Sequence, residues 1–509
     1  MTTDPVSEPA VEVEEFFRTD HLRDNLHGRA MSGGVVTAAS QATYAFLQIV
    51  SQIILARLLT PLDFGLVFMV LSITAFLGTF KEAGLSTATI QRDGITHAQV
   101  SNLFWTNIGL SISICVVTVL CAPIIAWFYH DPRLVKITLA IALTFLFSGA
   151  AVQHRALLNR QMRFLAVAAI DVGSAFCGLV AGIAAALLGW GYWSLVVLQV
   201  VVAAAELMIT WSVSSWRPGR FSRNSDTRSM LNFGVSMTIS SLLRRFARGG
   251  DTILVGRFHG TEAVGLYSRA SALLMRPMEQ FMNPFDAVFV PVLSRLQDQP
   301  ERYRRAFLQV FGGMAMSGFP FAALLYSLAS PIVLLLFGPQ WKDVIPIFEA
   351  FSLSALFIPL VFATTWLLTT QGRTKDILKA GIIASVVSVG SFAVGLPFGP
   401  AGVALAYSIG GLLVRMPLHF RLVGQAGPVT SVDLWTIVLK QIWSFVLIVA
   451  VIYGIRKLNP SWTHSMQLIV CVPIGLVIGA SLILVIPSQK RQIVDLVTKM
   501  IAELKRRRK

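Results

Sequence analysis

The sequence predicts an all-α polytopic membrane protein, and three features of its composition support this fold class. Only 13% of the 509 residues are charged and 55% are hydrophobic, whereas about a quarter of the residues in a soluble protein are charged. The mean hydropathy is +0.68. Lys and Arg outnumber Asp and Glu by 42 to 26. Because cytoplasmic loops of membrane proteins are rich in Lys and Arg, this excess indicates a lipid bilayer as partner, and no nucleic acid is expected.

The individual helices are predicted from runs of about 20 apolar residues, the length that crosses a hydrocarbon core of about 30 Å. In chain order, about fourteen such runs occupy 33–57, 63–86, 103–129, 134–154, 165–188, 190–213, 231–257, 264–291, 306–337, 344–370, 377–397, 400–421, 436–456 and 466–487. The expected fold is therefore about fourteen transmembrane helices.

Two kinds of connection alternate along the chain. Some are nearly absent, as at Gly189–Gly191 and Pro397–Pro400, whereas the loops at 155–163 and 217–228 are longer and rich in arginine. The positive-inside rule places the arginine-rich loops in the cytoplasm. We therefore expect a multi-pass protein of the bacterial inner membrane with both termini cytoplasmic.

The spans divide into two parallel six-helix bundles plus two extra C-terminal helices. The predicted segments are an acidic N-terminal arm (1–30), an N-terminal bundle (31–214), a cytoplasmic linker (215–230), a C-terminal bundle (231–425), two additional helices (426–487) and a basic amphipathic tail (488–509). The arm lacks the apolar core of a signal peptide. The tail is expected to lie on the anionic inner surface of the bilayer.

Three weak internal echoes support the division into two bundles. Ala56-Arg57 and Gly65-Leu66 are followed about 200 residues later by Gly256-Arg257 and Gly265-Leu266. A second echo pairs Gly189-Trp190-Gly191 with Gly399-Pro400-Ala401-Gly402, and a third pairs Arg160 with Arg373. Parallel repeats of this kind form one architecture of secondary transporters, with substrate held at the interface between the halves.

Four sequence stretches resemble the Wzx-type exporters. They lie at 55–66, 84–92, 158–164 and 251–257, and the resemblance covers about residues 30 to 425. This family belongs to the polysaccharide-transporter branch of the multidrug/oligosaccharidyl-lipid/polysaccharide exporter superfamily, and the chain is most similar to the colanic-acid and lipopolysaccharide exporter subgroup.

The resemblance implies both a fold and an activity. The implied fold is a V-shaped pair of six-helix bundles. The implied activity is a flippase that moves an undecaprenyl-diphosphate-linked oligosaccharide from the inner to the outer leaflet by alternating access, for lipopolysaccharide, capsule or exopolysaccharide export. The partners to be expected are this lipid-linked oligosaccharide, a proton or sodium ion, and the polysaccharide assembly machinery.

The seventh predicted span carries charges at membrane depth. Arg244 lies about 20 Å along the helix from residue 231, and Arg244, Arg248 and Asp251 share one face at spacings of four and three. An Arg at the centre of a helix costs about 2.5–3.5 kcal/mol when it faces lipid. These side chains are therefore expected to face an aqueous cavity or charged partners.

The eighth span repeats this pattern with Arg269, Arg276, Glu279 and Asp286 on one stripe. Because guanidinium groups bind phosphate oxygens in charge-assisted, bidentate contacts, Arg244, Arg248, Arg276 and Arg269 are the predicted substrate-binding residues. The alternative is a structural network in which the arginines only neutralise the neighbouring acids.

The remaining candidates are acids inside spans and two arginines at junctions. Asp251, Glu279, Glu82 and Asp286 form the predicted coupling or charge network, and Arg57 with Arg257 are predicted gate or interface residues. The fifth and sixth spans each contain an isolated acid, Asp171 and Glu206. An intramembrane carboxylate can carry a proton or sodium ion.

Two other functions compete with the flippase. A cation-coupled drug or small-solute antiporter of the same superfamily should favour carboxylates over arginines in its cavity. A membrane polysaccharide polymerase or ligase would need a catalytic outer loop, and the outer loops are short, so no enzyme is expected. The four cysteines show no metal-ligand spacing, and no cofactor or metal is predicted.

Overall fold

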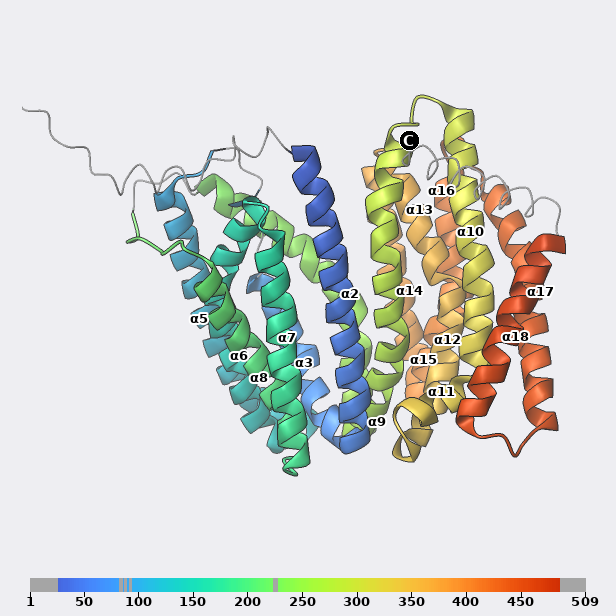
Figure 1. Cartoon of the computed structure of the whole chain (residues 1–509), viewed down its shortest axis with the longest axis horizontal. Helices are drawn as coiled ribbons and strands as arrows, with labels where there is room; N and C mark the ends of the chain where they lie inside the picture. The colour runs from blue at the N-terminus through green and yellow to red at the C-terminus, as the bar shows by residue number, and fades with distance from the viewer. Residues whose placement is uncertain (1–25, 82–85, 87–88, 91–93, 223–227, 486–509) are drawn as a thin grey trace, which may run out of the picture. The chain divides into compact units, whose positions relative to one another are not determined.

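The computed structural model describes residues 26–81, 86, 89–90, 94–222 and 228–485. Side chains are outside this description at 26–32, 80–81, 228–248, 279–281, 283–284, 286–288 and 483–485. All regular secondary structure in the described ranges is helical (Figure 1), so the predicted fold class is confirmed. Most of the acidic arm, Glu82 and the basic tail lie outside the described residues.

The chain divides into two compact units, Met1–Gly265 and Leu266–Lys509. The first contains α2 (Leu26–Leu58), α3 (Pro61–Lys81), α5 (His97–Tyr129), α6 (Arg133–Arg160), α7 (Phe164–Leu187) and α8 (Trp193–Val213). The helical run α9 (Arg228–Ser294) begins in the first unit and ends in the second. The predicted division into six-helix halves at the linker 215–230 stays a prediction.

The second unit contains shorter helical pieces. They are α10 (Pro300–Ser327), α11 (Ala329–Leu336), the 3₁₀ turn η2 (Pro339–Val344), α12 (Ile345–Ser352), the 3₁₀ turn η3 (Leu353–Leu356), α13 (Ile358–Thr370), α14 (Thr374–Gly395), the 3₁₀ turn η4 (Leu396–Phe398), α15 (Gly399–Gly410), the π-turn η5 (Gly411–Arg415), α16 (Met416–Gly424), α17 (Ser431–Leu458) and α18 (His464–Val485).

Ten segments in the described part of the chain are long and apolar enough to cross a membrane. One of them, Thr374–Gly424, is 51 residues long and contains two of the predicted spans. The helix α2 and the two limbs of α9 account for the remaining predicted spans. The chain is thus a multi-pass membrane protein.

Three predicted spans are interrupted in the structure, one of which, 400–421, contains the π-turn η5. The ninth was expected to run to 337, but α10 ends at Ser327 and α11 is a separate helix. The tenth is broken by η3 just before Pro359. A proline inside a helix removes one backbone hydrogen bond and clashes with the preceding turn, and Pro331 and Pro359 each follow such a break.

The two additional helices pack against α10. Figure 1 shows α17 and α18 side by side, and they contact α10 and α11. Their shared core contains Leu324, Leu328, Ile448, Ile452 and Cys471, all of which are buried. The appended pair is therefore a packed part of the second unit.

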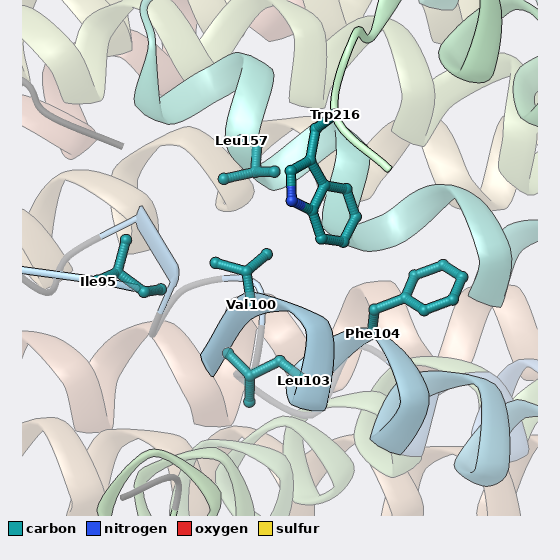
Figure 2. Close-up of a cluster of buried hydrophobic side chains, with 6 residues drawn as sticks. All are labelled: Ile95, Val100, Leu103, Phe104, Leu157 and Trp216. Atoms are coloured by element: carbon teal, nitrogen blue, oxygen red, sulfur yellow. The ribbon is translucent and has the colours of Figure 1, made fainter. Parts of the chain in front are cut away.

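The described part of the linker is an ordered segment that lies across the start of α5. Ser222 and Asn102 exchange two hydrogen bonds, of 2.5 and 2.8 Å, and the backbone of Gly219 bonds to Ser101 and Trp105 at 2.9 and 2.8 Å. The side chain of Trp216, from the linker, packs in an apolar cluster (Figure 2) that also contains Ile95, Val100, Leu103, Phe104 and Leu157. Residues 214–222 are therefore fixed to the first unit.

Backbone conformation agrees with the second echo at its first glycine, and it shifts the third echo by three residues. Gly189 and Gly399 both adopt positive φ, at 77° and 76°. The structural counterpart of Arg373 (φ −82°, ψ 60°) is Arg163 (φ −81°, ψ 61°) and not Arg160. Each follows a residue with positive φ, and each donates to carbonyls at the end of the sixth helix of its half.

Candidate functional site

The helical run α9 reverses direction at Gly260, between the seventh and eighth predicted spans. Gly260 has φ 82° and ψ −175°, a conformation that glycine adopts at no steric cost. A Cβ on Gly256 would lie 3.0 Å from Cγ2 of Val264, although residues eight apart in a straight helix are about 12 Å apart. The two limbs that carry the predicted arginines therefore meet at this turn.

The first echo forms a reciprocal glycine contact beside the turn. A Cβ on Gly65 would lie 1.9 Å from the carbonyl oxygen of Thr261, and a Cβ on Gly265 would lie 1.8 Å from that of Pro61. Pro61 and Thr261 are 200 residues apart, as are the two glycines. Equivalent residues of the two copies thus exchange equivalent contacts, the pattern of a local two-fold axis.

The predicted substrate-binding arginines differ in exposure. Arg269 is 3% exposed, whereas Arg276, two turns further along the same limb, is exposed. The repeat aligns Arg269 with Met69, which is 0% exposed, so the second copy buries a charge where the first copy buries a thioether. The side chains of Arg244 and Arg248 lie outside the described residues, and their role stays a prediction.

The predicted charge network is described at one position only. Asp251 is half-buried, and its Oδ1 accepts from the backbone N–H of Thr252 at 2.7 Å. The side chains of Glu279, Asp286 and Glu82 lie outside the described residues. The expected network therefore stays a prediction.

The two predicted gate residues, Arg57 and Arg257, are both exposed. The guanidinium of Arg257 lies 5.7 Å from the ring centroid of Phe128, within the range of a cation–π contact. This contact joins the first limb of α9 to the end of α5.

Sequence reasoning missed an ion-pair network that joins three helices of the first unit. Arg155 Nη2 lies 2.6 Å from Asp171 Oδ1, and Arg155 Nη1 lies 3.2 Å from Glu206 Oε1. Arg155 was expected in a loop and the two acids were expected to be isolated, and both expectations are wrong. The helix α6 continues to Arg160, which brings Arg155 inside it. No sequence spacing could pair residues on three different helices.

Comparison with known proteins places the chain among polysaccharide biosynthesis proteins. A family model described as "Polysaccharide biosynthesis protein" matches residues 54–346, more than half of the chain. The teichuronic acid biosynthesis protein TuaB of Bacillus subtilis (strain 168) is 27% identical over 350 residues, which cover 67% of this chain and 71% of TuaB.

Two further comparisons extend beyond the matched region. The lipopolysaccharide biosynthesis protein WzxC of Escherichia coli (strain K12) is 24% identical over 400 residues, covering 77% of this chain and 80% of WzxC. The lipid II flippase MurJ, in an inward closed conformation, has a similar fold, with a TM-score of 0.69 and 15% identity over 89% of this chain and 98% of MurJ.

Proposed function

The chain belongs to the polysaccharide biosynthesis protein family, and from this premise we propose that it flips undecaprenyl-diphosphate-linked oligosaccharide repeat units across the bacterial inner membrane. Its relatives are named for the biosynthesis of teichuronic acid and lipopolysaccharide, both of which are polysaccharides. The flippase MurJ shares its fold. A membrane protein of this family without a large hydrophilic domain in its described part is suited to transport of the lipid-linked intermediate.

Arg276 is the residue on which the substrate-binding proposal rests. It is the exposed arginine of the second limb of α9, on a segment long enough to reach membrane depth. A guanidinium binds two phosphate oxygens in one plane, which an ammonium group cannot match. In this proposal Arg276 binds the diphosphate, and Arg244 and Arg248 of the first limb remain the other predicted substrate-binding residues.

Arg269 takes a different part in the proposed alternating-access cycle. Its side chain is buried in the described conformation, so it cannot contact a headgroup until the surrounding helices move. Arg276 and Arg269 lie seven residues apart on one helical stripe. The headgroup accordingly meets Arg276 first and Arg269 in a later state of the cycle.

Replacement of Arg276 tests the proposal. In cells that lack the native copy, Arg276→Ala should reduce surface polysaccharide at least about ten-fold, because a hydrogen bond to a charged group contributes about 1.5–3 kcal/mol. Arg276→Lys should give an intermediate amount of surface polysaccharide, because lysine keeps the positive charge but lacks the planar guanidinium that contacts two phosphate oxygens at once. Surface polysaccharide, the lipid-linked intermediate and the amount of membrane-inserted protein are measured together.

The matched control is Arg305→Ala, an exposed arginine near the start of α10, which should leave export unchanged. Normal export by a stably inserted Arg276→Ala variant would contradict the role of Arg276. Unchanged polysaccharide in cells lacking the protein, together with increased sensitivity to cationic drugs, would instead support the antiporter alternative.

A further inference from the structure

The ion-pair network of the first unit contains more negative than positive charge. Arg155 on α6 bonds to Asp171 on α7 at 2.6 Å and to Glu206 on α8 at 3.2 Å. One guanidinium therefore neutralises only one of two carboxylates, and the fully ionised network carries a net charge of −1. By contrast, Arg304 and Asp433 in the second unit form a one-to-one pair at 2.6 Å.

The three residues lie in one layer within the helical bundle. Arg155 is five residues before the end of α6, Asp171 is seven residues after the start of α7, and Glu206 is seven residues before the end of α8. At 1.5 Å per residue, each lies about 8–11 Å from the same end of the unit. All three helices are long and apolar enough to cross a membrane, and the network is therefore expected to lie near the membrane surface rather than at the bilayer centre.

The network faces inward between the helices. Phe176 and Val180, which are 55% and 51% exposed, lie about 140° and 180° around α7 from Asp171. The face of α7 that carries Asp171 is therefore opposite its exposed apolar face. The side chains remain partly accessible, at 31% for Arg155, 16% for Asp171 and 27% for Glu206.

We propose that Arg155, Asp171 and Glu206 form a proton-binding site that couples proton movement to transport, an inference that rests on the proposed flippase function. Net charge in a region of low dielectric is costly, and two carboxylates that share one cation repel each other. One proton from water adds to a carboxylate oxygen, forms a neutral carboxylic acid and changes the charge of the site from −1 to 0.

Glu206 is the group that accepts the proton. Its distance to the guanidinium is 3.2 Å, compared with 2.6 Å for Asp171, and its side chain is the more exposed of the two acids. The shorter Arg155–Asp171 pair stays intact and neutral after proton binding. A sodium ion needs several oxygen ligands around it, and the guanidinium of Arg155 already bonds to both carboxylates, whereas a proton needs only one oxygen.

The surrounding helices supply no other charged partner for this network among the described ion pairs. The other titratable side chains described on the helices that pack around it are Tyr44 and Arg57 of α2, Asp63 of α3, His97, Cys115, Cys121 and Tyr129 of α5, Arg133, Lys136, His154 and Arg160 of α6, and Cys177 of α7. Arg163, immediately before α7, donates to the carbonyl of Val213 at the end of α8.

Two of these side chains, His154 and Arg57, are directed away from the network. His154 packs against Trp211 and Trp216, with ring centroids at 4.5 and 4.9 Å. Arg57 lies near the far end of α2, because the other end of α2, at Gly33, meets the start of α7 at Phe164. Among the described ion pairs, Arg155, Asp171 and Glu206 pair only with one another.

Infrared difference spectroscopy on the full chain in liposomes tests proton binding without requiring transport. Between neutral and acidic pH, the wild type should gain the C=O band of a protonated carboxyl group, and Glu206→Gln should lack this component. Asp171→Asn should also lack it, because one acid then faces one guanidinium. The matched control is Glu349→Gln, which removes a half-buried glutamate of α12 and should keep the band.

Proteoliposomes with undecaprenyl diphosphate as the probe test the coupling. A proton gradient should accelerate flipping by the wild type and by Glu349→Gln several-fold, whereas Glu206→Gln should flip at the same slow rate with and without the gradient.

A carboxyl band that persists in Glu206→Gln, equal stimulation of that variant, or stimulation by a sodium gradient alone would overturn the proton site. Failure of the wild type to flip the probe would refute the proposed flippase function, and the infrared band would still report on proton binding.

Discussion

At the scale of single residues, two glycines decide how closely the copies of the repeat approach. Gly65 faces the carbonyl of Thr261 and Gly265 faces that of Pro61 at distances that leave no room for a side chain. Small residues allow such backbone approach between membrane helices. The sequence shows that both glycines recur, but only the structure shows that they serve one shared contact.

Gly65→Ala should therefore destabilise the protein, because its methyl group would lie 1.9 Å from a backbone oxygen and overpacking typically costs about 1–3 kcal/mol. Thermal unfolding of the purified protein in detergent measures the effect. Gly109→Ala is the control, since no described atom beyond its own stretch of helix lies within 4 Å of its Cβ position and alanine favours the helix. Equal unfolding temperatures for Gly65→Ala and the wild type would show that the contact is not tight.

For single charged residues, the sequence predicts the position on a helix but not the exposure of the side chain. The stripe of Arg269 and Arg276 could be read from helical periodicity, but periodicity cannot tell that one side chain is buried and the other exposed. Exposure depends on the neighbouring helices, which come from distant parts of the chain. For the same reason, the pairing of Arg155 with Asp171 and Glu206 could not be predicted from the sequence.

At the scale of the helices, Arg163 and Arg373 both donate to carbonyls at a helix end, but Arg373 forms more and shorter hydrogen bonds. Arg373 donates to the carbonyls of Leu422, Val423 and Ala426 at 2.6–3.1 Å. Among the described residues, Arg163 donates to the carbonyl of Val213 alone, at 3.5 Å. The last carbonyls of a helix have no partner within that helix. Arg373 thus holds the end of α16 against the start of α14.

Arg373→Ala should destabilise the protein by about 1.5–3 kcal/mol, since hydrogen bonds to a charged group contribute about that amount. Arg163→Ala is the matched variant and should cost less, because its one contact is long. Denaturant or thermal unfolding of both variants in the same detergent compares them. A larger loss of stability for Arg163→Ala than for Arg373→Ala would contradict the stronger helix-end contacts of Arg373.

Helix existence was predictable from the sequence, but helix interruptions were less so. Apolar runs located nearly all of the described helices, since membrane spans need a minimum length. The breaks at Leu328 and at η3 were missed, although Pro331 and Pro359 mark them. Prolines are tolerated within membrane helices, so their presence alone does not reveal which of them ends a helix.

At the scale of the whole molecule, the charge distribution predicts its orientation in the membrane. The turn at Arg160–Arg163 is rich in arginine, and the turn at Gly189–Gly191 has no charged residue. The positive-inside rule assigns the first turn to the cytoplasm and the second to the opposite side.

Reporter fusions check this orientation. Alkaline phosphatase, which folds only outside the cytoplasm, should be active when it is fused after Leu188 and inactive when it is fused after Gln161. A fluorescent protein that matures only in the cytoplasm should show the reverse. Phosphatase activity in the fusion after Gln161 would contradict the predicted topology.

The sequence by itself determined the membrane class, the approximate helices and the recurrence of motifs, because these depend on local composition and on spacing along one chain. Tertiary structure decided that Gly65 and Gly265 share a reciprocal contact, that Arg163 is the counterpart of Arg373, and that Arg155 joins Asp171 to Glu206. Each of these depends on which faces of separate helices meet, and apolar residues turned toward lipid look the same in sequence as those turned toward a neighbouring helix.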